Sequence, residues 1–566
     1  MIGALRRKVR QLADDPALRR WLLERVLGRT SGAPPFTPHR PPYLDDGAFD
    51  LGTAPPVTLT EAPQPLPQGP LALTLPGATL ALEPGGEAAL FQDWADLETR
   101  LAVHRFAWLP LLGPSANPAW VARLFACWAE RHGRPDESWA WHPYTAAERA
   151  ANLLDYSRHH PLPPGAGALL AAHPPAIAAR LEYFGQHYTG NHLANNGRGL
   201  YLIGLALGWE RCAKLGLAIL LTEAGRLFGP SGILNEQSSH YHLLLTRNYL
   251  SCQLAASRHG RPEAAQLEAI VLRGLGILPH LALPGGLPLV GDISPDCPPE
   301  FLDGLLPGGG LEQGWGAWLS GEERVAVTAM RDGAPSSDPG LLRAEGWVRG
   351  DFGPWSGLWH ASPQGWPAMP GHAHQDLGAA ELHWRGQPVF IDPGRGAYGE
   401  TGEAARYRSA EVHGLLQVDG ADPYPPNRPY YDADFRRRLG RAAPCLAKAG
   451  DVVKLSHQGF RAQGVSEAGR SWIFAGGRLE ISDSLDGHGM HRITRRLVTP
   501  FPARLEEKGV MITTPVGRLL MTADAPFTLE GMTYWSAYGR AASCFAILVH
   551  TRSGLPWNGR ISVTAV

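Results

Sequence analysis

The hydrophobic period of this 566-residue chain changes once, near Arg343, and that change constrains the fold more than any other feature. Between about residues 86 and 280, apolar residues recur every three to four positions, as in W-V-A-R-L-F-A-C-W-A, which is typical of amphipathic helices. From about residue 343 the period becomes two, as in F-A-I-L-V-H, which is typical of strands. Helices followed by strands predict two packed domains with a cleft where they meet.

These patterns give the domain boundaries. Residues 86–342 carry successive helices joined by short loops, which predict a helical bundle or an α/α toroid. Residues 343–566 carry many short strands at near-regular spacing, which predict an antiparallel β-sandwich. Residues 1–85 are expected to hold a short basic helix within about residues 1 to 28 and a Pro-rich extended segment that wraps the next domain. The fold class is therefore multidomain α+β.

Composition narrows the range of partners. The net charge of -1 gives no overall field to attract nucleic acid or an anionic membrane. No apolar run is long enough to span a bilayer, and the basic N-terminus lacks the apolar core of a secretory signal. A cytoplasmic location is the default expectation, with the periplasm left open. The 6 cysteines are widely scattered, so we expect free thiols.

Residues 371–414 contain a potential metal site. His372 and His374 are two positions apart, so on an extended strand both side chains would point to the same face. Two strands are expected next, at 377–385 and 387–392, with a turn at Gly386 and with Asp392 ending the second. His374, Asp392 and His413 would suit a tetrahedral divalent ion, most simply zinc. The alternative is a chance H-x-H among 22 histidines.

Two further polar clusters precede apolar helical segments. The first, T-G-N-H-L-A-N-N-G-R-G, contains Asn191, His192 and Arg198. The second, L-N-E-Q-S-S-H-Y-H, contains Glu236 and Tyr241. Each could simply cap a helix, because Asn, Ser and Gly favour helix N-termini. Together with the H-x-H segment they supply amide donors, imidazoles and a phenol, which can stabilise a carboxylate and move a proton.

Taken together, these clusters make the sequence resemble the heparinase II/III-like family of polysaccharide lyases. The resemblance rests on a set of short motifs that occur in the family's order and span about half of the chain. They are W-A-W-H-P-Y-T-A-A-E-R, G-N-H-L, E-Q-S-S-H-Y-H, H-A-H-Q-D, D-P-G-R-G-A-Y and Y-R-S-A-E-V-H, running from Trp139 to His413. It implies an incomplete α/α toroid followed by an antiparallel β-sandwich. One departure is Gly414 after the last motif, where relatives often carry Asn-Thr.

The resemblance also implies roles for individual residues in β-elimination at a uronic acid. Asn191, His192 and His372 would neutralise the uronate carboxylate, Tyr241 would transfer protons as base and acid, and Tyr398 would be a second active-site tyrosine. Glu236, Arg198, Arg406 and Arg408 are the candidate substrate-binding residues, and the three arginines are also candidates for assisting the tyrosine. His374, Asp392 and His413 would hold one zinc ion per chain, in a structural role.

The expected partner is an anionic polysaccharide or oligosaccharide that contains a uronate. Alginate, heparin, chondroitin, hyaluronan and bacterial exopolysaccharides all meet that description. Two other functions stay open: a uronyl C5-epimerase, which would use the same carboxylate clamp, and a non-catalytic glycan-binding protein of exopolysaccharide production. A homodimer also stays open.

Overall fold

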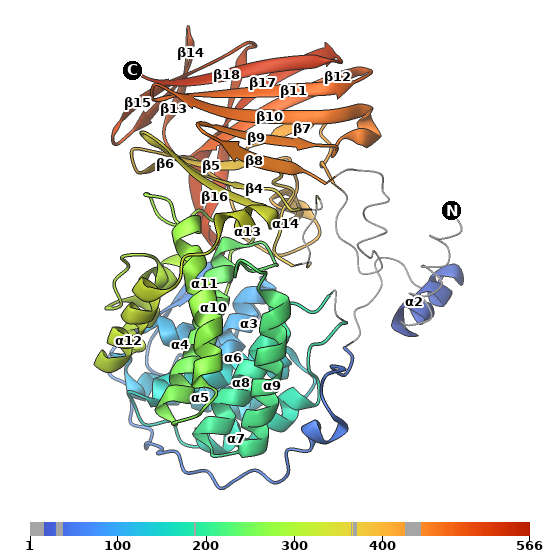
Figure 1. Ribbon diagram of the computed structural model, residues 1–566. Coiled ribbons are helices and arrows are strands. Elements are labelled where there is room, and N and C mark those ends of the chain that lie inside the picture. The colour runs from blue at the N-terminus through green and yellow to red at the C-terminus, as the bar shows by residue number, and fades with distance from the viewer. Residues whose placement is uncertain are drawn as a thin grey trace.

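The chain folds into a lower helical domain and an upper β domain (Figure 1). The computed structural model describes residues 16–29, 38–185, 188–363, 365, 369, 371–424 and 443–566. Of the helix expected within residues 1 to 28, α2 (Pro16–Val26) is described, and residues 1–15 lie outside the described part. No helix in the described ranges has both the length and the apolarity that a membrane crossing requires.

In the helical domain, helices that follow one another in the chain pack together, such as α8 with α9 and α10 with α11. Its α-helices are α3 (Leu97–Arg105), α4 (Trp108–Leu111), α5 (Pro118–His132), α6 (Pro143–Ser157), α7 (Ala166–Ala178), α8 (Asn191–Ala206), α9 (Glu210–Leu227), α10 (Ser239–Arg258), α11 (Ala264–Leu281), α12 (Gly321–Gly333) and α13 (Pro339–Ala344). Short 3-10 helices lie between them: η1 (Asp46–Phe49), η2 (Glu87–Phe91), η3 (Trp139–Trp141), η4 (Pro299–Leu305) and η5 (Gly314–Trp318). A hairpin of β1 (Leu71–Leu75) and β2 (Ala78–Leu82) packs beside α3 and α4.

Glycines let the central helices approach closely. A Cβ atom at Gly204 on α8 would lie 2.3 Å from the backbone nitrogen of Ala213 on α9, and one at Gly216 on α9 would lie 2.4 Å from that of Tyr201. Only a residue without a side chain fits such contacts. The close packing of α8 on α9 fixes the N-terminal end of α8, where Asn191 begins the helix.

The N-terminal end of α10 faces the β domain. Ser238 caps this helix by accepting a hydrogen bond from the backbone N–H of Tyr241 at 3.1 Å. The hydroxyl of Ser238 also donates to the carbonyl of Asp292 at 2.7 Å, so the cap is tied to the loop after α11. Tyr241 therefore stands in the first turn of a buried helix, where its position is closely fixed.

The described residues of the β domain form three antiparallel sheets. The large sheet has the order β13-β14-β15-β18-β11-β10-β9-β8, and the two four-stranded sheets have the orders β16-β17-β12-β7 and β3-β4-β5-β6. The strands are β3 (Trp347–Phe352), β4 (Trp355–His360), β5 (Ala380–Trp384), β6 (Gln387–Phe390), β7 (Leu416–Val418), β8 (Cys445–Ala449), β9 (Val452–His457), β10 (Val465–Ala475), β11 (Arg478–Gly487), β12 (Met490–Thr499), β13 (Ala503–Glu506), β14 (Gly509–Thr514), β15 (Gly517–Ala523), β16 (Phe527–Ala537), β17 (Arg540–Gly554) and β18 (Trp557–Ala565). Two short helices, α14 (Gly402–Arg406) and η6 (Arg461–Gln463), interrupt them.

The predicted fold class is confirmed. The strand pair expected around Gly386 is present as β5 and β6, and Gly386 adopts a φ of 78° at the turn, which favours glycine. The prediction that His372 and His374 lie on a strand is wrong, because both belong to an irregular loop before β5. That loop is held against the helical domain, where the backbone N–H of Asp292 donates to the carbonyl of His372 at 2.8 Å.

The turn between β16 and β17 also joins the two domains. The hydroxyl of Tyr538 donates to Asp96 at the start of α3 over 3.1 Å, and Arg540 forms a two-pronged ion pair with Glu300 on η4. In Figure 1, β16 extends from the upper sheets down toward the helices. The contacts place the two domains so that loops from both face a common region.

Candidate active site

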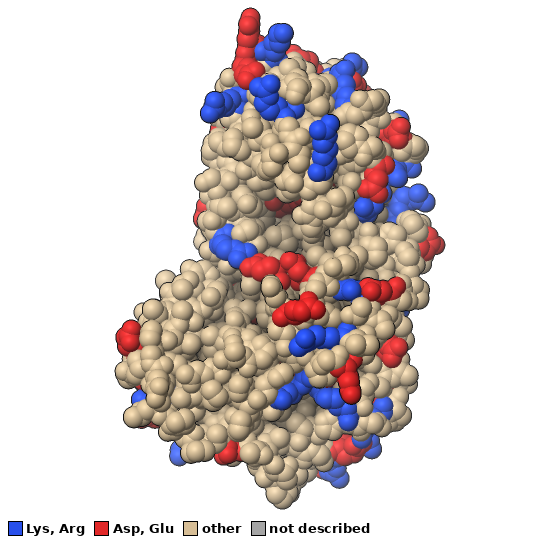
Figure 2. Space-filling model, turned by 90° about the vertical axis from the view of Figure 1, so that its left-hand side faces the viewer, with Lys and Arg blue, Asp and Glu red and all other residues tan. Residues whose placement is uncertain are grey.

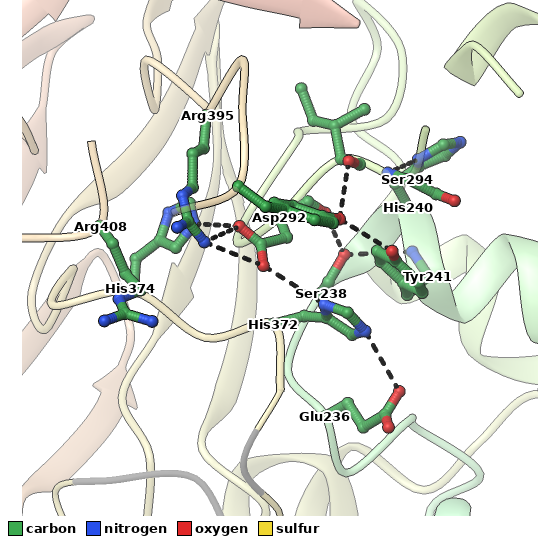
Figure 3. Close-up of polar contacts among 12 residues, drawn as sticks. Glu236, Ser238, His240, Tyr241, Asp292, Ser294, His372, His374, Arg395 and Arg408 are labelled. Carbon is green, nitrogen blue, oxygen red and sulfur yellow. Dashed lines mark hydrogen bonds and ion pairs between the residues drawn. The ribbon is translucent and has the colours of Figure 1, made fainter. Parts of the chain in front are cut away.

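A buried tyrosine and a histidine from different domains form the centre of the site. The rings of Tyr241 on α10 and His372 in the β domain are stacked, with centroids 3.5 Å apart and planes 11° apart (Figure 3). Asn191 at the start of α8 lies beside them, and its Nδ2 atom is 3.0 Å from Nε2 of His372. Three motifs far apart in the sequence thus meet at one place.

Glu236 holds Asn191 in position. Its carboxylate accepts hydrogen bonds from the backbone N–H of Asn191 at 2.7 Å and from the side-chain Nδ2 at 2.9 Å. A carboxylate at a helix N-terminus also interacts favourably with the helix dipole. Glu236 is buried, and both of its oxygens are used in this way. The expectation that Glu236 contacts substrate is therefore corrected: it positions Asn191.

The hydrogen bonds around Asn191 indicate which ring nitrogen of His372 accepts a hydrogen bond. Because Nδ2 of Asn191 faces the carboxylate of Glu236, this atom is a donor, and it must also donate to Nε2 of His372. Nε2 is then an acceptor, and the proton of His372 lies on Nδ1, which faces Asp292 at 3.3 Å. In this arrangement the lone pair on Nε2 of His372 points toward Asn191, and Nδ1 points toward Asp292.

Asp292 connects the tyrosine–histidine pair to the potential metal site. Its carboxylate lies 2.9 Å from Nε2 of His374, and it accepts a hydrogen bond from Arg395 at 3.1 Å. Burial raises the pKa of Asp292, but the hydrogen bonds from His372 and His374 and the charge of Arg395 outweigh burial, so the net pKa is lowered. Asp292 is thus a buried carboxylate anion. The sequence signal for it was only the G-D-I-S-P-D loop.

Tyr398 extends the site from the β domain. Its hydroxyl donates to the carbonyl of Ile293 at 3.1 Å, so in the 2.8 Å contact with Tyr241 it is the acceptor and Tyr241 the donor. Burial raises the pKa of Tyr241 well above its ordinary value, and the nearby carboxylate of Asp296 adds to that rise. Tyr241 therefore carries its proton at neutral pH.

His192 lies at the more open side of the site. Its side chain is 48% exposed, and Nδ1 is 2.7 Å from the buried carboxylate of Glu182. Burial lowers the pKa of His192, but the charge and hydrogen bond of Glu182 outweigh it and the net pKa is raised. The same pair lowers the pKa of Glu182 to about 2, although burial alone would raise it. The geometry thus favours the protonated form of His192 more than in a free histidine, and substrate can reach the side chain.

Sequence reasoning missed a second polar group beside the tyrosines. Tyr144 on α6 donates to Asp296 at 2.5 Å, and its ring centroid lies 4.4 Å from that of His192. Arg105 on α3 pairs with Asp296 at 2.8 Å and with Glu98 at 2.9 Å. The W-A-W-H-P-Y motif contained Tyr144, but nothing in the sequence showed that residues 98, 105 and 296 would meet it.

The three arginines expected near substrate each form an ion pair with a carboxylate. Arg406 pairs with Glu411, and Arg408 pairs with Glu400, both at the surface. Arg198 is fully buried and donates to Glu148 at 2.6 Å and to Asn195 at 3.2 Å. Its guanidinium cannot meet substrate without breaking this buried pair, so its predicted role is corrected to a structural one. The cations near the tyrosines are instead Arg105 and Arg395.

We expect Arg198→Ala to destabilise the fold by about 3–5 kcal/mol, because it leaves the Glu148 carboxylate buried without its partner. Urea unfolding is the measurement. Arg406→Ala is the matched control and should change stability by about 1 kcal/mol or less, since its ion pair is exposed. An Arg198→Ala protein as stable as that control would contradict the structural assignment.

The described residues include one cluster able to hold a metal ion: His374, Asp392 and His413, whose ligand atoms lie within 4.8 Å of one another. All three residues are buried. Nδ1 of His374 and Nε2 of His413 have no hydrogen-bond partner, so each imidazole has a free nitrogen for a ligand bond. Asp292 on the other nitrogen of His374 is the usual partner of a metal-bound histidine. The residues fit a divalent ion.

The fold resembles those of solved structures named as heparinases and heparan sulfate lyases. A heparinase III crystal structure has a TM-score of 0.62 and 14% identity, with 84% of this chain and 78% of that chain covered. A heparan sulfate lyase HepC mutant from Pedobacter heparinus has a TM-score of 0.52 and 16% identity, with the same coverage of 84% and 78%. A second heparinase III structure has a TM-score of 0.55 and 15% identity, with 84% of this chain and 80% of that chain covered. These likenesses show that the chain shares the overall fold of these structures.

A comparison with protein-family models matches the C-terminal part of the chain. Residues 334–554 match the family described as heparinase II/III-like, C-terminal. This match agrees with the resemblance carried by the motifs from Trp139 to His413. A search of curated protein sequences found no match.

Proposed function

We propose that this protein is a polysaccharide lyase that cleaves a uronate-containing glycan by β-elimination. The observation that supports this best is the meeting of Asn191, Tyr241 and His372 from two domains. A C5 proton next to a carboxylate is very weakly acidic. Its removal therefore needs three things together: donors on the carboxylate, a base at C5 and an acid at the leaving oxygen.

Asn191 and His192 would bind the uronate carboxylate. His192 offers an accessible imidazole whose pKa is raised by Glu182, and Asn191 offers the Nδ2–H that His372 now accepts. Such donors stabilise the charge that develops on the carboxylate as C5 loses its proton, by about 3–4 kcal/mol per donor.

His372 would act as the base at C5. A substrate carboxylate that takes the Nδ2–H of Asn191 also frees the lone pair on Nε2 of His372. C5 bears both the carboxylate and the proton, so one displaced hydrogen bond exposes the donor and the base side by side. Asp292 stabilises the imidazolium that forms, because its carboxylate faces Nδ1.

Tyr241 would act as the acid that protonates the glycosidic oxygen. Its raised pKa keeps the phenol protonated, which suits an acid better than the double role of base and acid expected from the sequence. Tyr398 accepts the hydrogen bond of Tyr241 and orients that phenol.

His374, Asp392 and His413 would hold one zinc ion, which suits two imidazoles and a carboxylate. Its role would be structural, because the ion would join the loop that carries His372 to the segments that carry the other two ligands. It takes no part in the proton transfers above.

Incubation with a panel of uronate polysaccharides tests the function. The expected result is rising ultraviolet absorbance from a C4–C5 unsaturated product. Exchange of deuterium into C5 without that absorbance would show a C5-epimerase instead. Glycan binding with neither signal, unchanged in Tyr241→Phe, would show a non-catalytic binding protein.

We expect Asn191→Ala to lower kcat by about 10²–10³-fold, because a donor on the developing charge is lost. Circular dichroism and the unfolding midpoint should change little beyond the loss of the bonds to Glu236. Asn117→Ala, which removes the Asn that caps α5, is a control with a similar loss at a helix start and should retain full kcat. Full turnover by Asn191→Ala would remove Asn191 from the carboxylate site.

A further inference from the structure

Helix α2 (Pro16–Val26) turns an apolar face outward. Leu22, Leu23, Val26 and Leu27 are 38%, 60%, 77% and 52% exposed. They lie one, three or four positions apart, so their side chains share one side of the helix. In Figure 1, α2 lies at the outer edge of the molecule, to the side of the helical domain. A helix on the surface of a globular protein ordinarily turns its apolar side to the core, so α2 has the reverse arrangement.

The covered side of α2 is the opposite one. Among residues 19–29, Trp21 and Glu24 are half-buried and the others are exposed. Trp21 and Glu24 are three positions apart and therefore share a side. The guanidinium of Arg25 lies 5.0 Å from the centroid of the Trp21 ring. The helix thus rests on its Trp21 side, and a contiguous set of exposed apolar residues is left for another surface to cover.

Basic side chains surround this apolar face. By helical geometry Arg20 and Arg25 flank it on its two sides, Arg19 lies at its N-terminal end and Arg29 follows the helix. Glu24, on the half-buried side, is the acidic residue of this segment. The whole chain is balanced, with 52 Lys and Arg against 53 Asp and Glu. On the face drawn in Figure 2, basic side chains lie among acidic ones. The excess of positive charge is therefore local to α2.

The surface that covers α2 must supply apolar contact with negative charge around it. An anionic polysaccharide would attract the arginines but has little apolar surface for the leucines. A second copy of this chain would place the same arginines against them, and like charges across an interface repel. A bilayer that contains anionic lipids supplies both partners, hydrocarbon for the apolar face and phosphate groups for the arginines.

We propose that α2 anchors this protein to the surface of a membrane that contains anionic lipids. The 11 residues of α2 extend about 16 Å, which is half of a hydrocarbon core of about 30 Å, so the helix would lie along the interface. Its four apolar side chains enter the boundary of the acyl chains, and the arginines reach the lipid phosphates. None of the residues proposed to act on the uronate lies on α2, so the anchor and the lyase activity can be tested separately.

Co-sedimentation of the full chain with large unilamellar vesicles tests the apolar contact. We expect binding to vesicles of two parts phosphatidylcholine and one part phosphatidylglycerol to be at least about ten-fold stronger than to phosphatidylcholine alone. Leu23→Ser/Val26→Ser should weaken that binding by about ten-fold or more, because apolar area is lost from the contact. Val325→Ser/Leu505→Ser is the matched control, since these residues are 71% and 56% exposed elsewhere, and it should bind as the wild-type chain does.

A second pair of variants tests the charge. Arg20→Gln/Arg25→Gln should remove the preference for phosphatidylglycerol, and added salt should weaken binding of the wild-type chain in the same direction, because ions screen exposed charges. Arg504→Gln/Arg518→Gln removes two exposed arginines from β13 and β15 and should keep the preference. Circular dichroism of all four variants should match that of the wild-type chain, since each substituted side chain is exposed.

Three results would overturn the anchor: no vesicle binding, equal binding to both kinds of vesicle, or binding that survives Leu23→Ser/Val26→Ser. Sedimentation velocity without vesicles examines the competing occupant. A dimer of the wild-type chain that dissociates in Leu23→Ser/Val26→Ser, with no vesicle binding, would assign the face to a second copy. Retention of the wild-type chain on a sulfated-polysaccharide column that is lost only in Arg20→Gln/Arg25→Gln, again with no vesicle binding, would assign the arginines to a glycan.

Discussion

Replacing Tyr241 with phenylalanine is expected to lower kcat by about 10²–10⁴-fold, the range that general acid–base groups contribute. The substitution removes one hydroxyl and keeps the ring that stacks on His372 at 3.5 Å. Its hydrogen bond to Tyr398 is lost, but Tyr398 keeps its bond to the carbonyl of Ile293. Glycan affinity should therefore change little while turnover falls.

Tyr249→Phe is the control for Tyr241→Phe. Tyr249 lies on the same helix, is equally buried and donates to the carbonyl of Leu220 at 2.9 Å, away from the site. The Tyr249→Phe protein should lose some stability and keep the kcat of the wild-type protein. The measurements are initial rates of unsaturated-product formation and binding of the intact glycan. A Tyr241→Phe protein with more than a tenth of normal kcat would show that another group protonates the leaving oxygen.

Replacing His413 with alanine is expected to remove the metal ion and to destabilise the β domain by about 3–5 kcal/mol. His413 is fully buried, and its Nδ1 is 2.7 Å from the buried carboxylate of Asp392. Without the imidazole, the buried carboxylate of Asp392 loses its contact with Nδ1 of His413 and, among the described residues, keeps the hydrogen bond from the backbone N–H of Gly394. The lost ligand also removes the binding energy of the ion from the folded state.

Metal analysis of the purified protein and denaturant unfolding measure both effects together. His457→Ala is the control, because His457 is buried in the same domain but accepts only from the backbone N–H of Gly459. It should lose some stability and keep one metal ion per chain. Stripping the ion from the wild-type chain with a chelator should lower the unfolding midpoint in the same direction as His413→Ala. A stable His413→Ala protein with a full complement of metal would rule out this ligand set.

The hydrophobic period was sufficient to predict the architecture, because helices and strands each need one apolar face at their own spacing. The turn at Gly386 was also predictable, since a left-handed backbone between two strands favours glycine. The conformation of the loop that carries His372 and His374 was not predictable from the sequence. Its shape is set by contacts with residues 291 and 292 of the other domain, where a Cβ on Gly291 would lie 2.6 Å from the carbonyl oxygen of His372.

The arginines illustrate a second limit. The sequence showed Arg198 close to Asn191, and by chain position it was a reasonable candidate partner for substrate. On α8 the two residues are almost two helical turns apart, and Arg198 faces Glu148 of α6 in the interior. Arg105 and Arg395 reach the tyrosines from α3 and from the β domain, at distances along the chain that no local pattern could indicate.

By itself, the sequence determined the two domains, their order and the residue types available for proton transfer, because periodicity and motifs are local properties of the chain. Only the tertiary structure decided which nitrogen of His372 is the acceptor and that Tyr241 keeps its proton. Each of these depends on burial and on charges from segments distant in sequence, and electrostatic energies are set by distances in space.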